Sequence, residues 1–422
     1  MGQHIIKKTP EKAILCAIAL PGKTEHTERS IEELGRLAET AGAIVIDSLI
    51  QSRESIHSKL YFGTGKLNTL GALAKEHDVD VIIFDDELTP SQQKHIEMEF
   101  PGFKIVDRSA LILDIFTMHA RTREAKTQVQ LAEAEYLLPR LAKQWTHLER
   151  QAGGIGMRGG PGETQIEIDR RLLRDRIKKL KLDLKKISVQ LDTKRKSRSR
   201  RFNVALVGYT NAGKSTLMNH YSGPSVDVED QLFKTLDTTV RRVQLDSSHT
   251  MYLSDTVGFI QKLPHQLVAS FRSTLKEAET ADLLLKVVDI SDPNFKEHMD
   301  TIDAVLEEFD IPEKKFITVF NKTDVVDNID DIKYVKRLYP DSFCISAVRK
   351  IGIEKLTDAI LKRIDDSSFV HHFYINPAEG KLIADLHKFG EVLESQFVED
   401  KIKFKVFLDS SVYDSLKKKY DL

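Results

Sequence analysis

Apolar residues in the first part of the chain form short runs that alternate with amphipathic stretches. The runs cover residues 13–18, 43–46 and 79–84, and helical patterns begin near Thr27 and Lys66. Short apolar runs separated by helical patterns are typical of parallel strands joined by helices. We therefore expect a small parallel α/β domain over residues 1–120.

The pattern changes to long helices between residues 121 and 200. One helical stretch covers residues 126–135, and Pro139 should kink or break it. A second helix carries apolar residues at alternating spacings of four and three, namely Leu173, Ile177, Leu180, Leu184, Ile187 and Leu191. This spacing is a heptad seam, which predicts an antiparallel hairpin or a short coiled coil.

The segment between these helices, residues 153–163, holds six glycines and cannot form a regular element. One interpretation is a plain flexible linker. The other is a loop that contacts RNA, because residues 171–201 carry 14 Lys/Arg against three Asp. Cationic side chains meet phosphate, and glycines permit close approach. A basic helix can equally be a solvated face, so both interpretations stay open.

After residue 201 apolar strands again alternate with helical patterns. From about residue 367 the order becomes strand, helix, strand, strand, helix. Apolar Ile402, Phe404, Val406 and Leu408 alternate along the second-last segment, which predicts a half-buried antiparallel strand. We expect a small α+β domain over residues 366–422, to which the sequence assigns no chemistry.

Composition adds limits. The 422 residues predict several domains, and the net charge of −1 argues neither for nor against nucleic acid. Only Cys16 and Cys344 are present, which fits a reducing compartment. No stretch approaches 18 apolar residues, and the N-terminus lacks the features of a signal peptide. We expect a soluble cytoplasmic protein, and a monomer, because no extended apolar seam exists beyond the hairpin.

Residues 208–215 spell the P-loop pattern G-x-x-x-x-G-K-[ST] between an apolar run, residues 204–207, and the start of a helix. That context is what the motif requires. The glycines let backbone N–H groups and the helix N-terminus hold a polyphosphate. Lys214 would reach the β- and γ-phosphates, and the Ser215 hydroxyl would ligate Mg²⁺.

The phrase N-K-x-D at residues 321–324 selects the base. The Asp324 carboxylate can accept two hydrogen bonds from guanine that adenine cannot offer. Asn321 can bond the other edge of the ring, and the Lys322 stem can cover its face. Two shorter phrases follow apolar strands: D-x-x-G at 255–258 and Ser-Ala at 346–347. Four motifs in this order predict a GTPase.

The switch and catalytic positions are less sharply defined. Thr235 is our choice for the second Mg²⁺ ligand, with Thr239 as the alternative. Phe259 stands where many regulatory GTPases place a glutamine that orients water, so we expect slow intrinsic turnover and stimulation by a partner. Asn211 suggests a further hypothesis, K⁺ held beside the phosphates; the alternative is a simple turn former.

The predicted site is therefore large. We expect Lys214, Thr235, Asp255 and Gly258 to act in catalysis, and Ser215 and Thr235 to ligate Mg²⁺. The residues expected to surround GTP or GDP are Gly208, Tyr209, Thr210, Asn211, Ala212, Gly213, Lys214, Ser215, Thr216, Phe233, Lys234, Thr235, Leu236, Asp237, Asp255, Thr256, Val257, Gly258, Asn321, Lys322, Thr323, Asp324, Ser346, Ala347 and Val348.

Longer phrases resemble the HflX family of translational GTPases along nearly the whole chain. They lie at residues 86–93, 107–116, 120–122, 153–156, 161–171 and 258–265. Two departures are visible. The Asp-Pro-Thr usual in switch I of the family is Asp237-Thr238-Thr239 here, which clouds the switch assignment, and Met157 precedes Arg158 in the glycine loop.

The resemblance implies a GTPase that binds the large ribosomal subunit and its rRNA, splits stalled or hibernating 70S ribosomes in the GTP state, and leaves after hydrolysis. Some family members also bind and hydrolyse ATP through the N-terminal region. The incomplete glycine loop at residues 63–66 matches that only in part, and a turn that caps a helix is the favoured interpretation. A ribosome-assembly GTPase and a non-ribosomal GTP-dependent switch protein remain as alternatives.

The expected fold class is α/β. A P-loop GTPase domain with a mostly parallel sheet occupies residues 201–365. It follows the small parallel α/β domain of residues 1–120 and the basic helical hairpin of residues 121–200, and it precedes the small α+β domain of residues 366–422.

Overall fold

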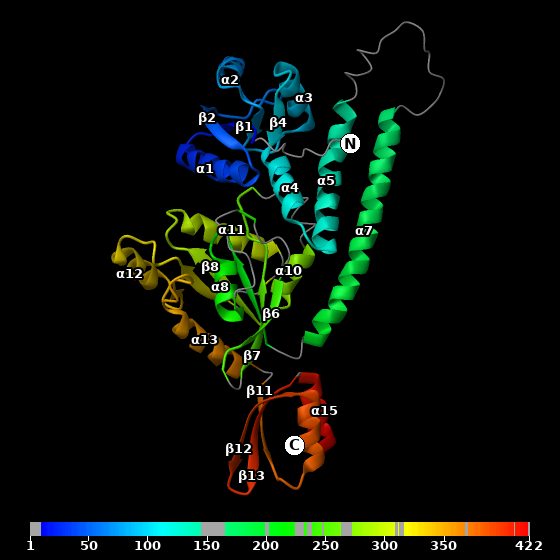
Figure 1. The fold of residues 1–422 in the computed structure, drawn as a ribbon, viewed down its shortest axis with the longest axis vertical. Helices are drawn as coiled ribbons and strands as arrows, with labels where there is room; N and C mark the ends of the chain where they lie inside the picture. The colour runs from blue at the N-terminus through cyan, green and yellow to red at the C-terminus, as the bar shows by residue number, and fades with distance from the viewer. Residues whose placement is uncertain are drawn as a thin grey trace. The chain divides into compact units, whose positions relative to one another are not determined.

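The computed structural model describes residues 10–144, 165–198, 202–223, 232–233, 239–246, 249–262, 272–308, 311, 316–367, 370–408 and 410–420 (Figure 1). The chain forms two compact units. The first runs to residue 187 and includes residues 232–233 and 261–262, and the second holds the rest. The predicted division into four domains stays a prediction.

The first unit is built on a four-stranded sheet. Its strands are β1 (Lys12–Ala19), β2 (Ile44–Ser52), β3 (Val81–Phe84) and β4 (Lys104–Asp107). All neighbours pair in parallel, in the order β2-β1-β3-β4. The buried runs of β1 and β3 carry almost no exposed side chain, as expected where helices cover both faces. The predicted small parallel α/β fold is confirmed.

Four helices follow the strands: α1 (Thr24–Thr40), α2 (Thr64–Glu76), α3 (Pro90–Glu99) and α4 (Arg108–His119). Helices α1 and α4 contact each other and share one face of the sheet. The other face holds an apolar core built with α2 and α3, which includes Phe62, Phe84 and Ile96. Gly63 is the N-cap residue of α2, which agrees with the favoured helix-capping interpretation of residues 63–66.

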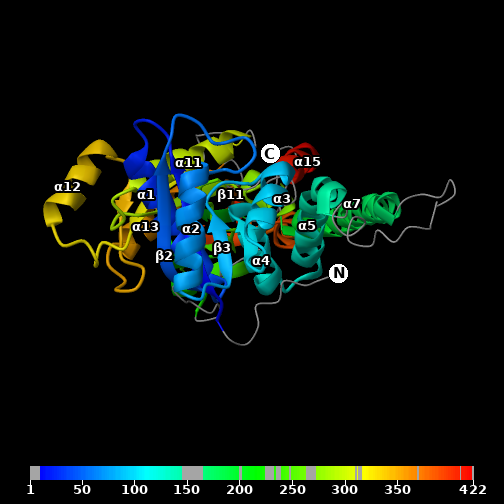
Figure 2. The ribbon, with the colours of Figure 1, turned by 90° about the horizontal axis from the view of Figure 1, so that it is seen from above.

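Two long helices complete the hairpin: α5 (Arg123–Gln144) and α7 (Gln165–Arg198). They lie side by side in both views (Figures 1 and 2), and Lys181 on α7 forms an ion pair of 2.8 Å with Glu135 on α5. Of the two predicted effects of Pro139, the break is wrong, because α5 continues through it, and the kink stays a prediction. The glycine-rich segment, residues 153–163, lies outside the described residues.

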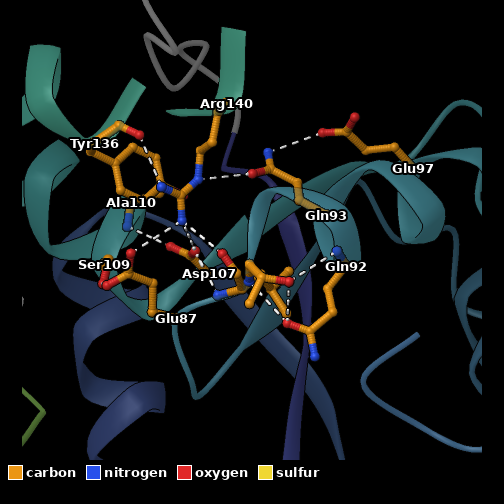
Figure 3. Close-up of polar contacts among 11 residues, drawn as sticks. Glu87, Gln92, Gln93, Glu97, Asp107, Ser109, Ala110, Tyr136 and Arg140 are labelled. Carbon is orange, nitrogen blue, oxygen red and sulfur yellow. Dashed lines mark hydrogen bonds and ion pairs between the residues drawn. The ribbon is translucent and has the colours of Figure 1, made fainter. Parts of the chain in front are cut away.

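Contacts of the next residue explain why the helix persists past the proline. The Arg140 guanidinium donates to the Leu88 carbonyl at 2.7 Å and to the Gln93 side chain at 3.2 Å, and it lies 3.3 Å from the Asp107 carboxylate (Figure 3). It also stacks 3.5 Å from the centre of the Tyr136 ring. These contacts fix α5 to β4 and α3 at the turn where Pro139 removes a backbone donor.

The second unit contains a six-stranded sheet in the order β10-β9-β8-β5-β7-β6. Its strands are β5 (Phe202–Gly208), β6 (Thr239–Gln244), β7 (Thr250–Asp255), β8 (Leu283–Asp289), β9 (Phe316–Asn321) and β10 (Phe343–Cys344). Only β6, at one edge, pairs antiparallel. The helices are α8 (Lys214–Ser222), α10 (Arg272–Glu279), α11 (Phe295–Glu308), α12 (Ile329–Leu338) and α13 (Ile353–Asp365).

The end of the chain adds a three-stranded antiparallel sheet in the order β11-β13-β12. Its elements are β11 (Val370–Ile375), α14 (Gly380–Phe389), β12 (Glu391–Val398), β13 (Lys401–Phe407) and α15 (Ser410–Tyr420), in the predicted order. Leu382, Leu386 and Leu416 of the helices bury one face of the sheet against Phe404 and Val406.

Charged groups anchor this small sheet to the larger one. Asp365, at the end of α13, forms an ion pair with Lys405 of β13. Its carboxylate also lies 3.2 Å from the imidazole of His249, just before β7. Burial opposes ionisation of Asp365, but the hydrogen bonds from Lys405 and His249 and the charge of Lys405 outweigh it and lower the pKa of the carboxyl. No helix among the described residues has the length and apolar character needed to cross a membrane.

Candidate nucleotide site

The P-loop joins the carboxyl end of β5 to the first turn of α8, and its glycines are required by space. A Cβ on Gly208 would lie 2.3 Å from the Val287 carbonyl oxygen. Gly213 has φ +89°, and a Cβ there would lie 2.2 Å from the Asn321 amide nitrogen. Larger residues would push neighbouring strands or the loop itself, so the motif keeps a concave backbone at a helix N-terminus.

Lys214 begins α8, and its side chain is only 6% exposed. Its ammonium group donates to the carbonyl oxygens of Gly208 at 3.0 Å and Tyr209 at 2.7 Å. Burial lowers the pKa of Lys214 to about 8, although the Asp255 carboxylate opposes the shift. The side chain is thus a desolvated cation held by neutral carbonyls, which gives a phosphate a strong partner.

Ser215 and Asp255 bring oxygen ligands together beside this lysine. The Ser215 hydroxyl donates to the Asp255 carboxylate at 2.7 Å, and Asp255 is fully buried at the end of β7. A hydroxyl and a carboxylate are the hard oxygen ligands that Mg²⁺ prefers. The residues present therefore fit the ion that the motif implies.

Gly258 approaches the P-loop more closely than any other residue type could. A Cβ there would lie 2.8 Å from the Thr210 Cα and 3.0 Å from the Lys214 ammonium nitrogen. The next residue, Phe259, forms two backbone hydrogen bonds with the loop. Its N–H donates to the Gly208 carbonyl at 3.1 Å, and its carbonyl accepts from the Thr210 N–H at 2.8 Å. The Phe259 side chain is buried. The D-x-x-G phrase therefore lies directly against the phosphate loop.

Asn321 has a bracing role that the sequence did not predict. Its amide nitrogen donates to the Ala212 carbonyl at 2.9 Å, and its amide oxygen accepts from the Ala347 N–H at 3.0 Å. One side chain at the end of β9 thus ties the P-loop to the Ser-Ala loop. The predicted contact between Asn321 and the base stays a prediction.

The rest of the base motif surrounds the same strand end. Lys322, at φ +65°, forms a 2.7 Å ion pair with Asp289, and the Thr323 N–H donates to the Ile345 carbonyl at 3.2 Å. The Arg349 guanidinium lies 4.0 Å from the Asp324 carboxylate. Asp289 and Arg349 belong to no recognised motif, and only the tertiary structure brings them to this site.

Comparison with known proteins decides the family. Three family models match in succession: "GTP-binding GTPase N-terminal" over residues 28–117, "GTP-binding GTPase Middle Region" over 119–198 and "50S ribosome-binding GTPase" over 203–322. The GTPase HflX of Magnetococcus marinus is 40% identical over 93% of this chain and 91% of its own length. The chain belongs to the HflX family of GTPases.

Other HflX proteins match at similar levels. GTPase HflX of Flavobacterium psychrophilum is 51% identical over 74% of this chain and 76% of its own length, and that of Escherichia coli is 39% identical over 88% and 87%. A solved GDP complex of a GTP-binding protein from Sulfolobus solfataricus shares 24% identity over 84% of this chain and 98% of its own, with a TM-score of 0.43. Membership in the HflX family establishes that this protein binds and hydrolyses GTP.

Several residues expected in this HflX site have defined positions without a tested role. Ala212 and Val257 are buried, Thr216 is half-buried in the first turn of α8, and Val348 is exposed. The Thr256 hydroxyl donates to the Leu206 carbonyl at 2.7 Å, so it braces β7 against β5. The Ser346 hydroxyl accepts from the Arg349 N–H at 3.0 Å, which closes the loop.

The loop also contains two residues with unusual surroundings. Asn211 has φ +59°, a left-handed conformation that Asn tolerates. Tyr209 stacks on His298 of α11, with ring centres 3.8 Å apart. His298 belongs to no motif, and this stacking was not predicted.

The switch I prediction falls mostly outside the described part of the chain. Lys234, Thr235, Leu236 and Asp237 lie there, so the Mg²⁺ ligand Thr235 stays a prediction. Phe233 is described and buried in the first unit, where its ring meets Phe116 of α4 edge-on at 4.5 Å. Its expected contact with the nucleotide also stays a prediction.

Proposed function

We propose that this HflX GTPase binds the large ribosomal subunit and its rRNA, and splits stalled or hibernating 70S ribosomes in the GTP-bound state. The basic helix α7 carries the proposal: 13 of its residues are Lys or Arg and five are Asp or Glu. Dense cations favour binding to a phosphate backbone. The description of the matched GTPase model, a 50S ribosome-binding family, supports the same partner.

Ribosome binding would supply what the hydrolytic site lacks. Mg²⁺ on Ser215 and Thr235, with Asp255 reached through water, would neutralise phosphate charge. Lys214 would hold the β- and γ-phosphates, and the Gly258 N–H would face the γ-phosphate. Phe259 has no group that could orient water, so basal turnover would be slow. Groups contributed by a partner can raise such rates ~10³–10⁵-fold.

K⁺ beside Asn211 is a second part of this proposal. Its amide oxygen stands in the phosphate loop, where a monovalent cation would add positive charge as the γ-phosphate leaves. Replacing K⁺ by Na⁺ should then lower the stimulated rate and leave the affinity for GDP nearly unchanged. Equal stimulated rates in the two salts would remove K⁺ from the mechanism.

The decisive experiment measures GTP turnover by the protein alone and with purified large ribosomal subunits, in potassium buffer. Stimulation is expected, and charge reversal of Lys178, Lys179, Lys185 and Lys186 on α7 should weaken it most strongly at low salt, because fewer contacts to phosphate leave a shallower salt dependence. A matched control reverses four exposed cations elsewhere: Lys381, Lys401, Lys417 and Lys418. Tight GTP binding without stimulation would favour a non-ribosomal switch protein instead.

Splitting and assembly act on different particles. Added protein with a non-hydrolysable GTP analogue should convert purified 70S ribosomes to free subunits in a sucrose gradient. If 70S ribosomes stay intact while depleted cells accumulate precursor large subunits, the assembly function replaces the splitting function.

A further inference from the structure

A groove outside the nucleotide site lies at the free edge of the six-stranded sheet. It runs between α12, β10 and the start of α13 and has a volume of about 580 Å³. Its lining consists of Ile332, Lys333, Lys336, Arg337, Phe343, Cys344, Gly352 and Lys355. Half of these residues are cations, and the lining includes no carboxylate. Opposite charges are usually interspersed on a surface, so this imbalance calls for an explanation.

Helix stability accounts for only part of the charge. Lys336 and Arg337 stand in the last turn of α12, where the helix dipole favours cations. Lys355 instead stands in the first turn of α13, where the dipole favours anions. Within the described residues, the side chains of Arg337 and Lys355 have no hydrogen-bond or ion-pair partner. Two cations thus border the groove with their charge uncompensated.

The other two cations are held in place. Lys336 donates to the Pro340 carbonyl at 2.9 Å and to the Ser342 carbonyl, and its ammonium group lies 5.5 Å from the centre of the Phe343 ring. Lys333 pairs with Asp330 on the solvent side at 2.8 Å. Lys336 is therefore preorganised, which lowers the entropy cost of binding an anion, whereas the Lys333–Asp330 pair is exposed.

The floor of the groove is apolar. Ile332, Phe343 and Cys344 are each partly exposed there. Gly352, at φ +72°, tolerates no side chain, because a Cβ would lie 2.5 Å from the Cys344 carbonyl oxygen. A cationic rim around an apolar floor matches a ligand with the opposite distribution, apolar in the middle and anionic at its sides.

We propose that this groove is a docking site for an acidic amphipathic segment of a partner protein. Apolar side chains of that segment would fill the floor, and its carboxylates would pair with Arg337 and Lys355. RNA fits less well, because Lys336 already covers the Phe343 ring on which a base would stack. The site does not depend on ribosome binding. Since Cys344 precedes Ser346 by two residues, an occupant would sit beside the loop of the base motif.

The groove contains its own reporter. Cys344 is partly exposed in the lining, whereas Cys16, the other thiol of the chain, is buried in β1. Burial also raises the pKa of each thiol, so both react slowly, but only Cys344 is open to solvent. The rate at which a maleimide labels Cys344 therefore reports occupancy of the groove in the unmodified chain.

The test measures that rate with three probes. The first is a helical peptide of about 18 residues with Leu every third or fourth position and Glu elsewhere. The second is its scrambled form with the same composition, and the third is a poly(U) oligonucleotide. We expect only the amphipathic peptide to slow labelling. Protection by poly(U) instead, equal protection by both peptides, or no protection at all would each overturn the proposal.

Charge reversal gives the second arm. The pair Arg337→Glu and Lys355→Glu should weaken the peptide's affinity roughly tenfold, and more at low salt, because two attractions become repulsions. The matched pair Lys381→Glu and Lys401→Glu changes the net charge equally and should leave the affinity unchanged. Basal GTP turnover of both pairs should equal that of the parent, which reports an intact fold. Equal loss of affinity in both pairs would indicate attraction by net charge rather than by the groove.

Discussion

The chain buries two cations in opposite ways. Arg140 of the first unit is 5% exposed and has carboxylate, amide and carbonyl partners plus the Tyr136 ring. Lys214 of the second unit is equally buried, but its ammonium group donates to two backbone carbonyls. Carboxylates of the fold neutralise the charge of Arg140, whereas the charge of Lys214 remains to be neutralised by a bound phosphate. The difference separates a structural cation from a binding cation.

The largest expected effect is the loss of stability when Arg140 is removed. Arg140→Ala leaves the Asp107 carboxylate buried without its cation and releases α5 from β4. Loss of one partner of a buried pair costs about 3–5 kcal/mol, so we expect a fall of that size in the unfolding free energy. Denaturant titration measures it. Arg140→Lys is the control and should recover part of the loss, since it restores charge without the planar fork. Unchanged stability would make the clamp dispensable.

Lys214 should show the opposite profile. Lys214→Met removes a desolvated charge, so stability should stay the same or rise. GTP hydrolysis should fall ~10²–10³-fold, the size typical of losing one preorganised electrostatic contact to the transition state. Turnover and denaturant titration on one preparation test both halves. A variant that loses stability as much as Arg140→Ala would refute the distinction.

Asp324 tests a second binding charge of the second unit, an anion expected to recognise the base. Asp324→Asn should cost GTP about 1–3 kcal/mol of binding, because one guanine donor loses its acceptor. Xanthosine triphosphate offers the complementary pattern and should gain affinity. Competition between the two nucleotides measures the shift. An unchanged preference for guanosine would remove Asp324 from base recognition.

The smallest expected effect is the pH dependence of GTP affinity that the Lys214 ammonium group causes. The pKa of Lys214 in the free protein is about 8, and a bound polyphosphate should raise it, so binding takes up a proton above that pH. Affinity for GTP should then be nearly constant below pH 8 and fall roughly tenfold by pH 9. Titration calorimetry in two buffers of different ionisation enthalpy detects the uptake. Lys214→Met should lack this pH dependence.

Several parts of the fold were predictable from local patterns. Apolar runs predicted the parallel strands β1, β3 and β5, since a strand buried on both faces must be apolar throughout. That α5 continues through Pro139 was not predictable, because the contacts of Arg140 come from Leu88, α3 and β4, which lie far from it in sequence. Local propensity is a weak prior that such tertiary contacts override.

The candidate site divides in the same manner. Lys214, Ser215, Asp255 and Gly258 were expected together because they belong to two motifs of one GTPase pattern, and the structure brings all four to one place. The brace through Asn321, the Tyr209–His298 stack and the approach of Arg349 to Asp324 were not expected. Each depends on a pair of residues that no motif spacing connects.

The sequence by itself determined the phosphate loop, the base motif and the alternation of strands and helices, since backbone conformation and strand burial depend on local residue type. Only the tertiary structure decided which buried charges are neutralised, that Asn321 ties two loops together, and that four cations line one groove. Those properties arise from distances between residues remote in the chain, and electrostatic energy depends on such distances and on desolvation rather than on sequence order.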